Sequence, residues 1–172
     1  MPLPLPLFDP RTVPVIGAGE RLPAVPPERI TPQALRARFQ RPPIWQPEIA
    51  VEPLFSDRPP SRASVLLALV QRAEPTLLLT ERSLHMSTHS GQVAFPGGRT
   101  DPEDRDAIAT ALREAHEEVG LDPARADVLG VLPEYFTGSS FRVTPVVALV
   151  PPTIALRSNP QAVARLFEVP LS

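Results

Sequence analysis

The stretch FPGGRTDPEDRDAIATALREAHEEVGL, residues 95–121, places three glutamates where an isolated helix tolerates them least. Glu114, Glu117 and Glu118 are spaced i, i+3 and i+4, so their carboxylates crowd one face of a helix. They also lie just before Gly120, a residue type common at helix ends, where the helix dipole disfavours negative charge. Each such contact costs a few tenths of a kcal/mol, and up to about 1 kcal/mol near the terminus. A bound divalent cation is the simplest compensation, and local rules are broken chiefly at functional sites.

The sequence predicts that this helix runs from about residue 106 to residue 119. Its apolar residues recur at helical spacing and form one stripe, with most charged residues on the other side. Asp104 or Asp106 is expected to cap its start, after a tight turn made by Gly97 and Gly98. Two adjacent glutamates alone would fit an ordinary solvated helix end. The glycine turn and the C-terminal glycine at fixed offsets favour a functional site instead.

Apolar runs on both sides of this helix predict β-strands. The expected strands cover residues 63–70, 76–80, 92–95, 127–132 and 142–150. An Asn159-Pro160 pair is expected to cap a further short helix over residues 161–167. Strands with one strong helix between them predict an α/β fold, in which a mixed sheet is covered by helices as an α/β/α sandwich.

Residues 1–60 differ in composition from the rest of the chain, because most of the 25 prolines lie there. Thr31–Gln40 is expected to form a short helix, with Thr31 as its N-cap and a proline at its first position. Turns and polyproline II conformation are expected around it. We therefore expect a proline-rich N-terminal arm over residues 1–60, packed on a main domain over residues 61–172.

Composition excludes several classes of function. The net charge of −2 over 172 residues gives no basic surface for nucleic acid, and the absence of cysteine excludes disulfides and thiol nucleophiles. The longest apolar runs have the length of a strand and cannot span a membrane. The N-terminus has no basic segment of the kind that begins a signal peptide, so we expect a cytoplasmic protein without membrane or nucleic-acid partners.

The stretch from Gly98 to Leu121 resembles the Nudix box, a glycine and a distal acid followed by R-E-x-x-E-E-x-G and an aliphatic residue. The chain reads Arg113-Glu114-Ala115-His116-Glu117-Glu118-Val119-Gly120-Leu121 at this place, with Asp104 as the distal acid. One residue more than usual separates the glycine from the arginine, which is a feature of the coenzyme A pyrophosphatase-like branch. Three further segments resemble the signature of that branch: Leu78-Leu79-Thr80-Glu81-Arg82-Ser83, Gly91-Gln92 and Phe95-Pro96-Gly97-Gly98.

The resemblance implies a loop–helix–loop Nudix box within the sandwich and a metal-dependent pyrophosphohydrolase. Its expected substrate is coenzyme A or a derivative, split into 3′,5′-ADP and 4′-phosphopantetheine. By family position, Glu114 and Glu118 are the principal ligands of Mg²⁺ or Mn²⁺, with Glu117 as ligand or base. Arg113 is expected to belong to the catalytic group by pairing with a carboxylate and supporting the loop.

The same resemblance suggests residues that bind substrate. Arg82 and Gln92 are expected to meet phosphates or the pantetheine arm, although an ion pair within the fold is an equal alternative for Arg82. Gly97 and Gly98 let the backbone turn tightly beside the metal, and His89 is a further candidate contact.

Departures from the family pattern leave two alternatives open. Ser140 stands where a glycine is common, in a loop expected to need positive φ, and Ala162 stands where relatives usually have a glutamate. Relatives also continue past Ser172, so an uncovered apolar face would favour pairing of two copies into a homodimer. The alternatives to a coenzyme A diphosphatase are a Nudix hydrolase of another nucleoside diphosphate-X and a catalytically weakened Nudix ligand-binding module.

Overall fold

The structure is a computed structural model that describes residues 14, 23–45, 51, 59–84 and 90–171. The described chain contains eight strands, two α-helices and two short 3-10 helices. In chain order these are η2 Pro27–Arg29, α1 Pro32–Gln40, β1 Ser61–Val70, β2 Thr76–Arg82, β3 Val93–Ala94, β4 Gly97–Arg99, α2 Ala107–Val119, η3 Pro123–Arg125, β5 Asp127–Val131, β6 Tyr135–Thr137, β7 Phe141–Val150 and β8 Val163–Pro170. His89, one of the predicted substrate contacts, lies outside the described residues.

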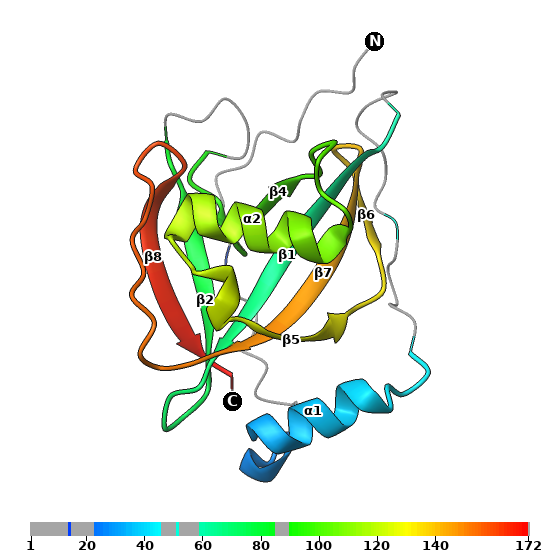
Figure 1. The fold of residues 1–172 in the computed structure, drawn as a ribbon, viewed down its shortest axis with the longest axis vertical. Coiled ribbons are helices and arrows are strands. Elements are labelled where there is room, and N and C mark those ends of the chain that lie inside the picture. The colour runs from blue at the N-terminus through cyan, green and yellow to red at the C-terminus, as the bar shows by residue number, and fades with distance from the viewer. Residues whose placement is uncertain (1–13, 15–22, 46–50, 52–58, 85–89, 172) are drawn as a thin grey trace.

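The eight strands form one mixed sheet around β1. β1 and β7 run parallel over their whole length, from Ser61 opposite Phe141 to Val70 opposite Val150. The other pairs of named strands are antiparallel, and the main path through the sheet is β3-β2-β1-β7-β5. β4 pairs with β1, β6 with β7 and β8 with β2. The predicted α/β fold with a mixed sheet is therefore confirmed (Figure 1).

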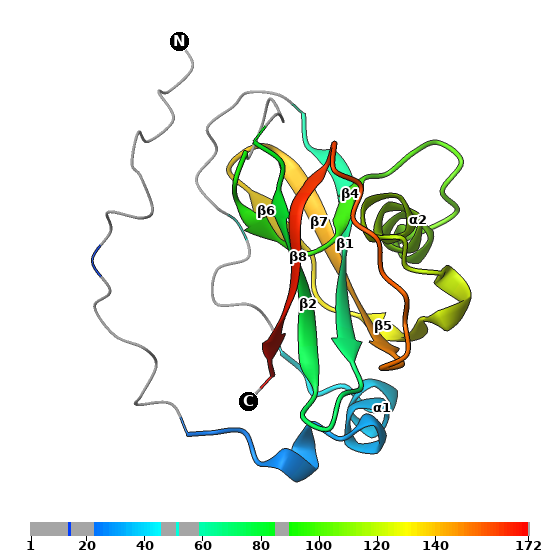
Figure 2. The ribbon, with the colours of Figure 1, turned by 90° about the vertical axis from the view of Figure 1, so that its left-hand side faces the viewer.

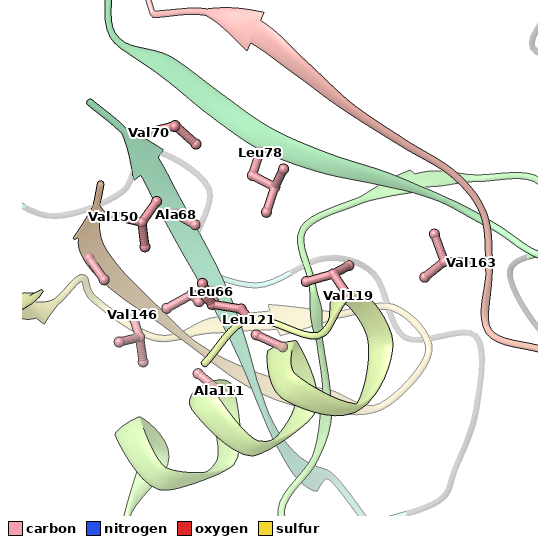
Figure 3. Close-up of a cluster of buried hydrophobic side chains, with 12 residues drawn as sticks. Leu66, Ala68, Val70, Leu78, Ala111, Val119, Leu121, Val146, Val150 and Val163 are labelled. Carbon is pink, nitrogen blue, oxygen red and sulfur yellow. The ribbon is translucent and has the colours of Figure 1, made fainter. Parts of the chain in front are cut away.

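The main core lies between the sheet and α2 (Figure 3). Alternate residues of β1, Leu66, Ala68 and Val70, are fully buried on this face, as the period of a strand requires. The apolar stripe of α2 meets them through Ala111 and Val119, which are also fully buried. Full burial of one aliphatic side chain contributes about 1.5–3 kcal/mol to folding, so this cluster fixes α2 on the sheet.

A second, smaller apolar cluster lies on the opposite face and involves α1. Leu35 and Phe39 of α1 pack against the buried side chains of Leu69, Val147 and Leu149. The two helices therefore pack against apolar clusters on opposite faces of the sheet, and Figure 2 shows α1 below the ends of the strands. This is the sandwich arrangement that the sequence predicted.

α1 begins as its sequence predicts. The hydroxyl of Thr31 accepts the backbone N–H of Ala34 at 3.2 Å, and Pro32 occupies the first helical position. An ion pair of 2.7 Å joins Arg36 of this helix to Asp127 of β5. Both side chains are about half exposed, so the pair contributes no more than about 1 kcal/mol, and the apolar contacts hold α1 in place.

The helix predicted over residues 161–167 is wrong, because this segment forms strand β8. The carbonyl of Asn159 accepts the N–H groups of Ala162 and Val163, so the Asn-Pro pair makes a turn that does not continue as a helix. From Val163 onward the backbone pairs with the edge of β2. Tertiary strand pairing thus overrides a local cap signal.

Two smaller predictions change at the glycine segment. Gly97 and Gly98 do not form a tight turn; they begin strand β4, which pairs antiparallel with residues 63–65. The strand expected over residues 92–95 shortens to the two residues of β3. The expectation of positive φ near the β6–β7 connection is confirmed, since Ser140 has φ of 64°.

Shortening a buried core side chain should lower the free energy of unfolding far more than shortening an exposed leucine. Leu66→Ala removes a fully buried side chain next to α2, and we expect it to lower the free energy of unfolding by about 2–5 kcal/mol. Leu84→Ala alters a side chain that is 74% exposed, and we expect a change of no more than about 0.5 kcal/mol. Urea unfolding of both variants measures the difference; equal midpoints would contradict the assignment of Leu66 to the core.

Candidate active site

The caps of α2 fix which way its glutamates point. Asp106 is the N-cap, and its carboxylate accepts the backbone N–H of Ala109 at 2.8 Å. Gly120 ends the helix in the left-handed conformation with φ of 67°, and its N–H bonds to the carbonyl of His116. Of the two aspartates considered from sequence, Asp106 therefore caps the helix and Asp104 is left for another role.

Two of the three glutamates lie against the backbone of β4. The carboxylate of Glu118 accepts the N–H of Gly97 at 3.1 Å, and its side chain is only 11% exposed. The carboxylate of Glu114 lies directly over Gly98, where an added Cβ would be 2.4 Å from its carboxyl carbon. Glu117 is the exposed member, with 55% of its side chain accessible. The helix and the glycine strand thus hold two carboxylates side by side at one edge of α2.

Both inward carboxylates carry unfavourable charge. Burial raises the pKa of Glu118, and the nearby carboxylates of Glu114 and Glu117 add to this, while the Gly97 N–H and Arg82 oppose it. Burial also raises the pKa of Glu114 and outweighs its contact with Arg113, which lowers it, while Glu117 and Asp101 add smaller increases. The site therefore holds more negative charge than its surroundings neutralise.

Arg113 connects three carboxylates to the backbone of β4. Its guanidinium donates to Asp104 at 3.0 and 2.9 Å, to Glu114 at 3.1 Å and to Glu117 at 3.3 Å. It also donates to the carbonyl of Arg99 at 2.9 Å. The expected pairing of Arg113 with a carboxylate is thus present, and the planar fork of arginine suits such a network.

Asp104 is the principal partner of Arg113. Its side chain is only 6% exposed, and the hydrogen bonds from Arg113 hold its pKa well below the usual range. The same pair raises the pKa of Arg113 above its usual value. The connection between β4 and α2 is therefore held to the helix by a charged, bidentate contact.

Of the predicted substrate residues, Arg82 lies at the end of β2 near Glu118, and Gln92 lies just before β3. The guanidinium of Arg82 is 3.9 Å from the Glu118 carboxylate, and its buried Nε–H has no acceptor within the described part of the chain. The N–H of Arg82 donates to the carbonyl of Gln92 at 2.9 Å, which closes the loop between β2 and β3. The exposed Gln92 is thus joined through the backbone to the half-buried Arg82, which is the one that lies near Glu118.

The segment before β8 covers the C-terminal end of α2, which sequence reasoning did not anticipate. The N–H of Asn159 donates to the carbonyl of Glu118 at 2.8 Å, and that of Arg157 donates to Val119 at 2.9 Å. The carbonyl of Ala162 accepts the N–H of Ser83. Residue 162 is therefore close to the predicted site, although no local pattern links it to α2.

The donor set suits a hard divalent cation. Carboxylate oxygens are the ligands that Mg²⁺ and Mn²⁺ prefer, and the absence of a side chain at Gly98 leaves room for Glu114 against the backbone. Among the residues that the structure describes, no three Asp, Glu or His side chains already converge as a metal-binding group. Glu114 and Glu118 are instead occupied by Arg113 and by the N–H of Gly97.

Removal of the charge at Asp104 should weaken the fold in a pH-dependent way. We expect Asp104→Asn to lower the free energy of unfolding by about 1–3 kcal/mol at pH 7, the usual value of hydrogen bonds between charged groups. Because the pKa of Asp104 is lowered in the folded state, the difference should narrow as the pH falls below about 4, where the unfolded chain takes up its proton first. Denaturant titrations at pH 7 and pH 3 measure this.

Asp101→Asn is the matched control for that variant. Asp101 lies 3.8 Å from the same guanidinium but is 55% exposed, so we expect less than about 1 kcal/mol at either pH. Equal effects of the two substitutions would show that the Asp104 contact has no special strength.

Comparison with known proteins agrees with this arrangement. The family model described as the NUDIX domain matches residues 60–164, which include the glutamates and the whole of β1 to β7. None of the helices in the described ranges is long and apolar enough to cross a membrane.

Individual relatives give the same result. The protein named "Uncharacterized Nudix hydrolase NudL" from Escherichia coli strain K12 is 49% identical over 136 residues, which are 79% of this chain and 67% of that protein. The protein of the same name from Photorhabdus laumondii is 53% identical over 110 residues, 64% of this chain and 59% of that protein. The Ap4A hydrolase of C. elegans in a binary complex shares the fold, with a TM-score of 0.54 and 20% identity over 64% of this chain and 80% of that one. The chain therefore belongs to the Nudix hydrolase family.

Proposed function

We propose that this Nudix hydrolase splits the pyrophosphate bond of coenzyme A or its derivatives, releasing 3′,5′-ADP and 4′-phosphopantetheine. The observation that supports pyrophosphate chemistry is the pair of crowded carboxylates, Glu114 and Glu118, held against Gly97 and Gly98 of β4. Coenzyme A is supported by sequence alone, through the segments around Arg82 and the long spacing before Arg113.

Glu114 and Glu118 would hold Mg²⁺ or Mn²⁺, with Glu117 as a third ligand or as the base. When bound, such a cation neutralises charge on the pyrophosphate and lowers the pKa of a bound water. Glu117 is the most exposed of the three, so it is the one best placed to accept a proton from solvent-side water. In the overall reaction water adds to one phosphorus, the bridging P–O bond breaks, and the other phosphate leaves with the electron pair.

The remaining residues would position the substrate. The buried Nε–H of Arg82 lacks an acceptor within the described residues, and a phosphate oxygen would supply one. Gln92 would offer a polar side chain and Gly97 and Gly98 their backbone groups, and His89 stays a prediction from sequence. Arg113 would act by holding Glu114 and Glu117 in place through its hydrogen bonds.

One observation favours the alternative of a domain that binds nucleotides with little turnover. Residue 162 is an alanine that packs against the main apolar cluster, so this position offers no carboxylate near Ser83 and Glu118. A different nucleoside diphosphate-X is the other alternative substrate.

A turnover assay separates these functions. The purified chain is incubated with Mg²⁺ or Mn²⁺ and with coenzyme A, NADH, ADP-ribose or a UDP-sugar, and products are separated by chromatography. We expect 3′,5′-ADP from coenzyme A, and a loss of at least about 100-fold in kcat for Glu118→Gln, since several kcal/mol of charge stabilisation would be removed. Glu103→Gln, on the exposed loop before α2, is the control and should keep full activity.

The pattern of products decides between the proposals. Cleavage of another substrate in preference to coenzyme A would replace the substrate assignment. Saturable binding with no turnover of any compound would support the ligand-binding alternative and overturn both hydrolase assignments.

The stability of Glu118→Gln should report on the metal independently of turnover. In EDTA at pH 7 we expect the variant to be more stable than the natural chain by about 0.5–1 kcal/mol, the scale of like-charge pairs near a helix C-terminus. Burial raises the pKa of Glu118 in the folded chain. The difference in free energy of unfolding between the variant and the natural chain should therefore vanish as the pH falls below about 4.3, where this carboxylate is protonated in the unfolded chain as well as in the folded one.

Added Mg²⁺ or Mn²⁺ should make the natural chain more stable than Glu118→Gln, because only the natural chain keeps the full set of metal ligands. Thermal unfolding with and without the cation measures both effects. A rise in Tm of equal size in both proteins would contradict the assignment of Glu118 as a ligand.

A further inference from the structure

We propose that a polar cavity beneath the start of α2 binds a tetrahedral oxyanion of the phosphate class. The cavity has a volume of about 170 Å³ and lies between β1, β7 and the connection from β4 to α2. Figure 1 shows the start of α2 at the end of the helix that is farther from β8. From Ala107 to Glu118 the helix rises about 16 Å. Neither Glu114 nor Glu118 lines the cavity, although Arg113 connects Asp104 of its wall to Glu114.

A buried hydroxyl without a partner points to a ligand in this cavity. Ser64 of β1 lines it, is only 1% exposed, and has no hydrogen-bond partner for its Oγ among the described residues. An unpaired buried hydroxyl destabilises a fold, so such groups usually contact a ligand or ordered water. Ser64 is fixed by strand pairing, opposite Gly98 in β4, and cannot turn to solvent.

Further donors line the same cavity. The hydroxyl of Thr100, which lies 3.3 Å from that of Thr110, and the hydroxyl of Thr144 add two further polar groups to the lining. Ala107, the first residue of α2, also lines the cavity. The N–H groups of the first helical turn lack acceptors within the helix, and the helix dipole favours negative charge there.

The carboxylates at the cavity are already engaged. Asp104 accepts two hydrogen bonds from Arg113, and Glu134 accepts from Arg142 at 2.7 Å. Asp106 accepts the N–H of Ala109. Each therefore has its charge compensated locally, which reduces its repulsion of an anion.

The cations at the cavity are not fully engaged. Arg62 is exposed at its wall and has no ion-pair partner within the described ranges, whereas Arg105 is 3.4 Å from Asp106. The lining as a whole is balanced in formal charge, with three arginines and three carboxylates, and Arg62 is the arginine whose guanidinium is left to meet a ligand. A water molecule occupies about 30 Å³ in the liquid, so a cavity of this size holds several waters or one tetrahedral anion, and the hydroxyl of Ser64 and the N–H groups at the start of α2 are donors that an anion would accept.

Two sources of the anion share this chemistry. One is free inorganic phosphate, and the other is the phosphate monoester of a nucleotide such as 3′,5′-ADP. The inference rests on the cavity alone and holds whether or not coenzyme A is the substrate.

The test measures phosphate binding without added divalent cation. Isothermal titration and thermal unfolding compare inorganic phosphate, 3′,5′-ADP and 5′-AMP with chloride at equal ionic strength. Ser64→Ala should weaken the binding on the order of tenfold, and Arg62→Gln severalfold in low salt. Arg29→Gln, an equal loss of charge on η2, should leave it unchanged. Without phosphate, Ser64→Ala should unfold at the same temperature as the natural chain or higher, because the lost hydroxyl had no partner.

The outcomes separate the sources and can overturn the proposal. Tighter binding of 3′,5′-ADP than of phosphate or 5′-AMP, removed by Ser64→Ala, would assign the cavity to a nucleotide phosphate. Binding of phosphate that equals or exceeds that of the nucleotides, again sensitive to Ser64→Ala, would assign it to the free ion. No phosphate-dependent change in the natural chain, or the same affinity in Ser64→Ala, would show that the cavity holds only water.

Discussion

The close approach of Gly97 and Gly98 to their neighbours is the constraint on which the site depends. A Cβ at residue 97 would lie 2.4 Å from the carbonyl oxygen of Ser64, and one at residue 98 would lie 2.4 Å from the carboxyl carbon of Glu114. The two glycines therefore let β4 touch β1 on one side and α2 on the other. Without that approach the carboxylates of Glu114 and Glu118 would not reach the backbone, and the sheet and the helix would not share a site.

Much of the site was predictable from sequence, because its signals are local. Caps, a C-terminal glycine and charge spacing fix α2 within about one residue, and a helix of that phase brings Arg113 near the glutamates. The segment before β8 could not be predicted in this way. Its Asn-Pro pair has the local form of a helix cap, but the open edge of β2 and the free carbonyls of α2 determine its path. The cavity at Ser64 also has no sequence signal, because it arises from β1, β7 and the connection from β4 to α2, which are distant in the chain.

The charges on α2 illustrate how the fold tolerates an unfavourable cluster. Three glutamates crowd one face, yet Glu118 is buried and Glu114 is half-buried, and this burial raises the pKa values of both carboxyl groups. The hydrogen bonds from Arg113 to Asp104 oppose this destabilisation, because they connect the helix to the loop before it. The apolar contacts of Ala111 and Val119 with β1 then hold the charged face in place. A stable core on one side of the helix thus supports an unstable arrangement on the other.

The parallel pairing of β1 with β7 has a consequence for how the protein folds. Ser61 lies opposite Phe141, so this contact closes a loop that contains β2 to β6 and all of α2. Closing so long a loop loses chain entropy before any contact is gained, which makes such pairings slow to form. Until they form, α2 has no complete sheet to pack against, and its glutamates remain dispersed in water. The buried carboxylates are therefore expected to be among the last features to appear on the folding pathway, after the topology is complete.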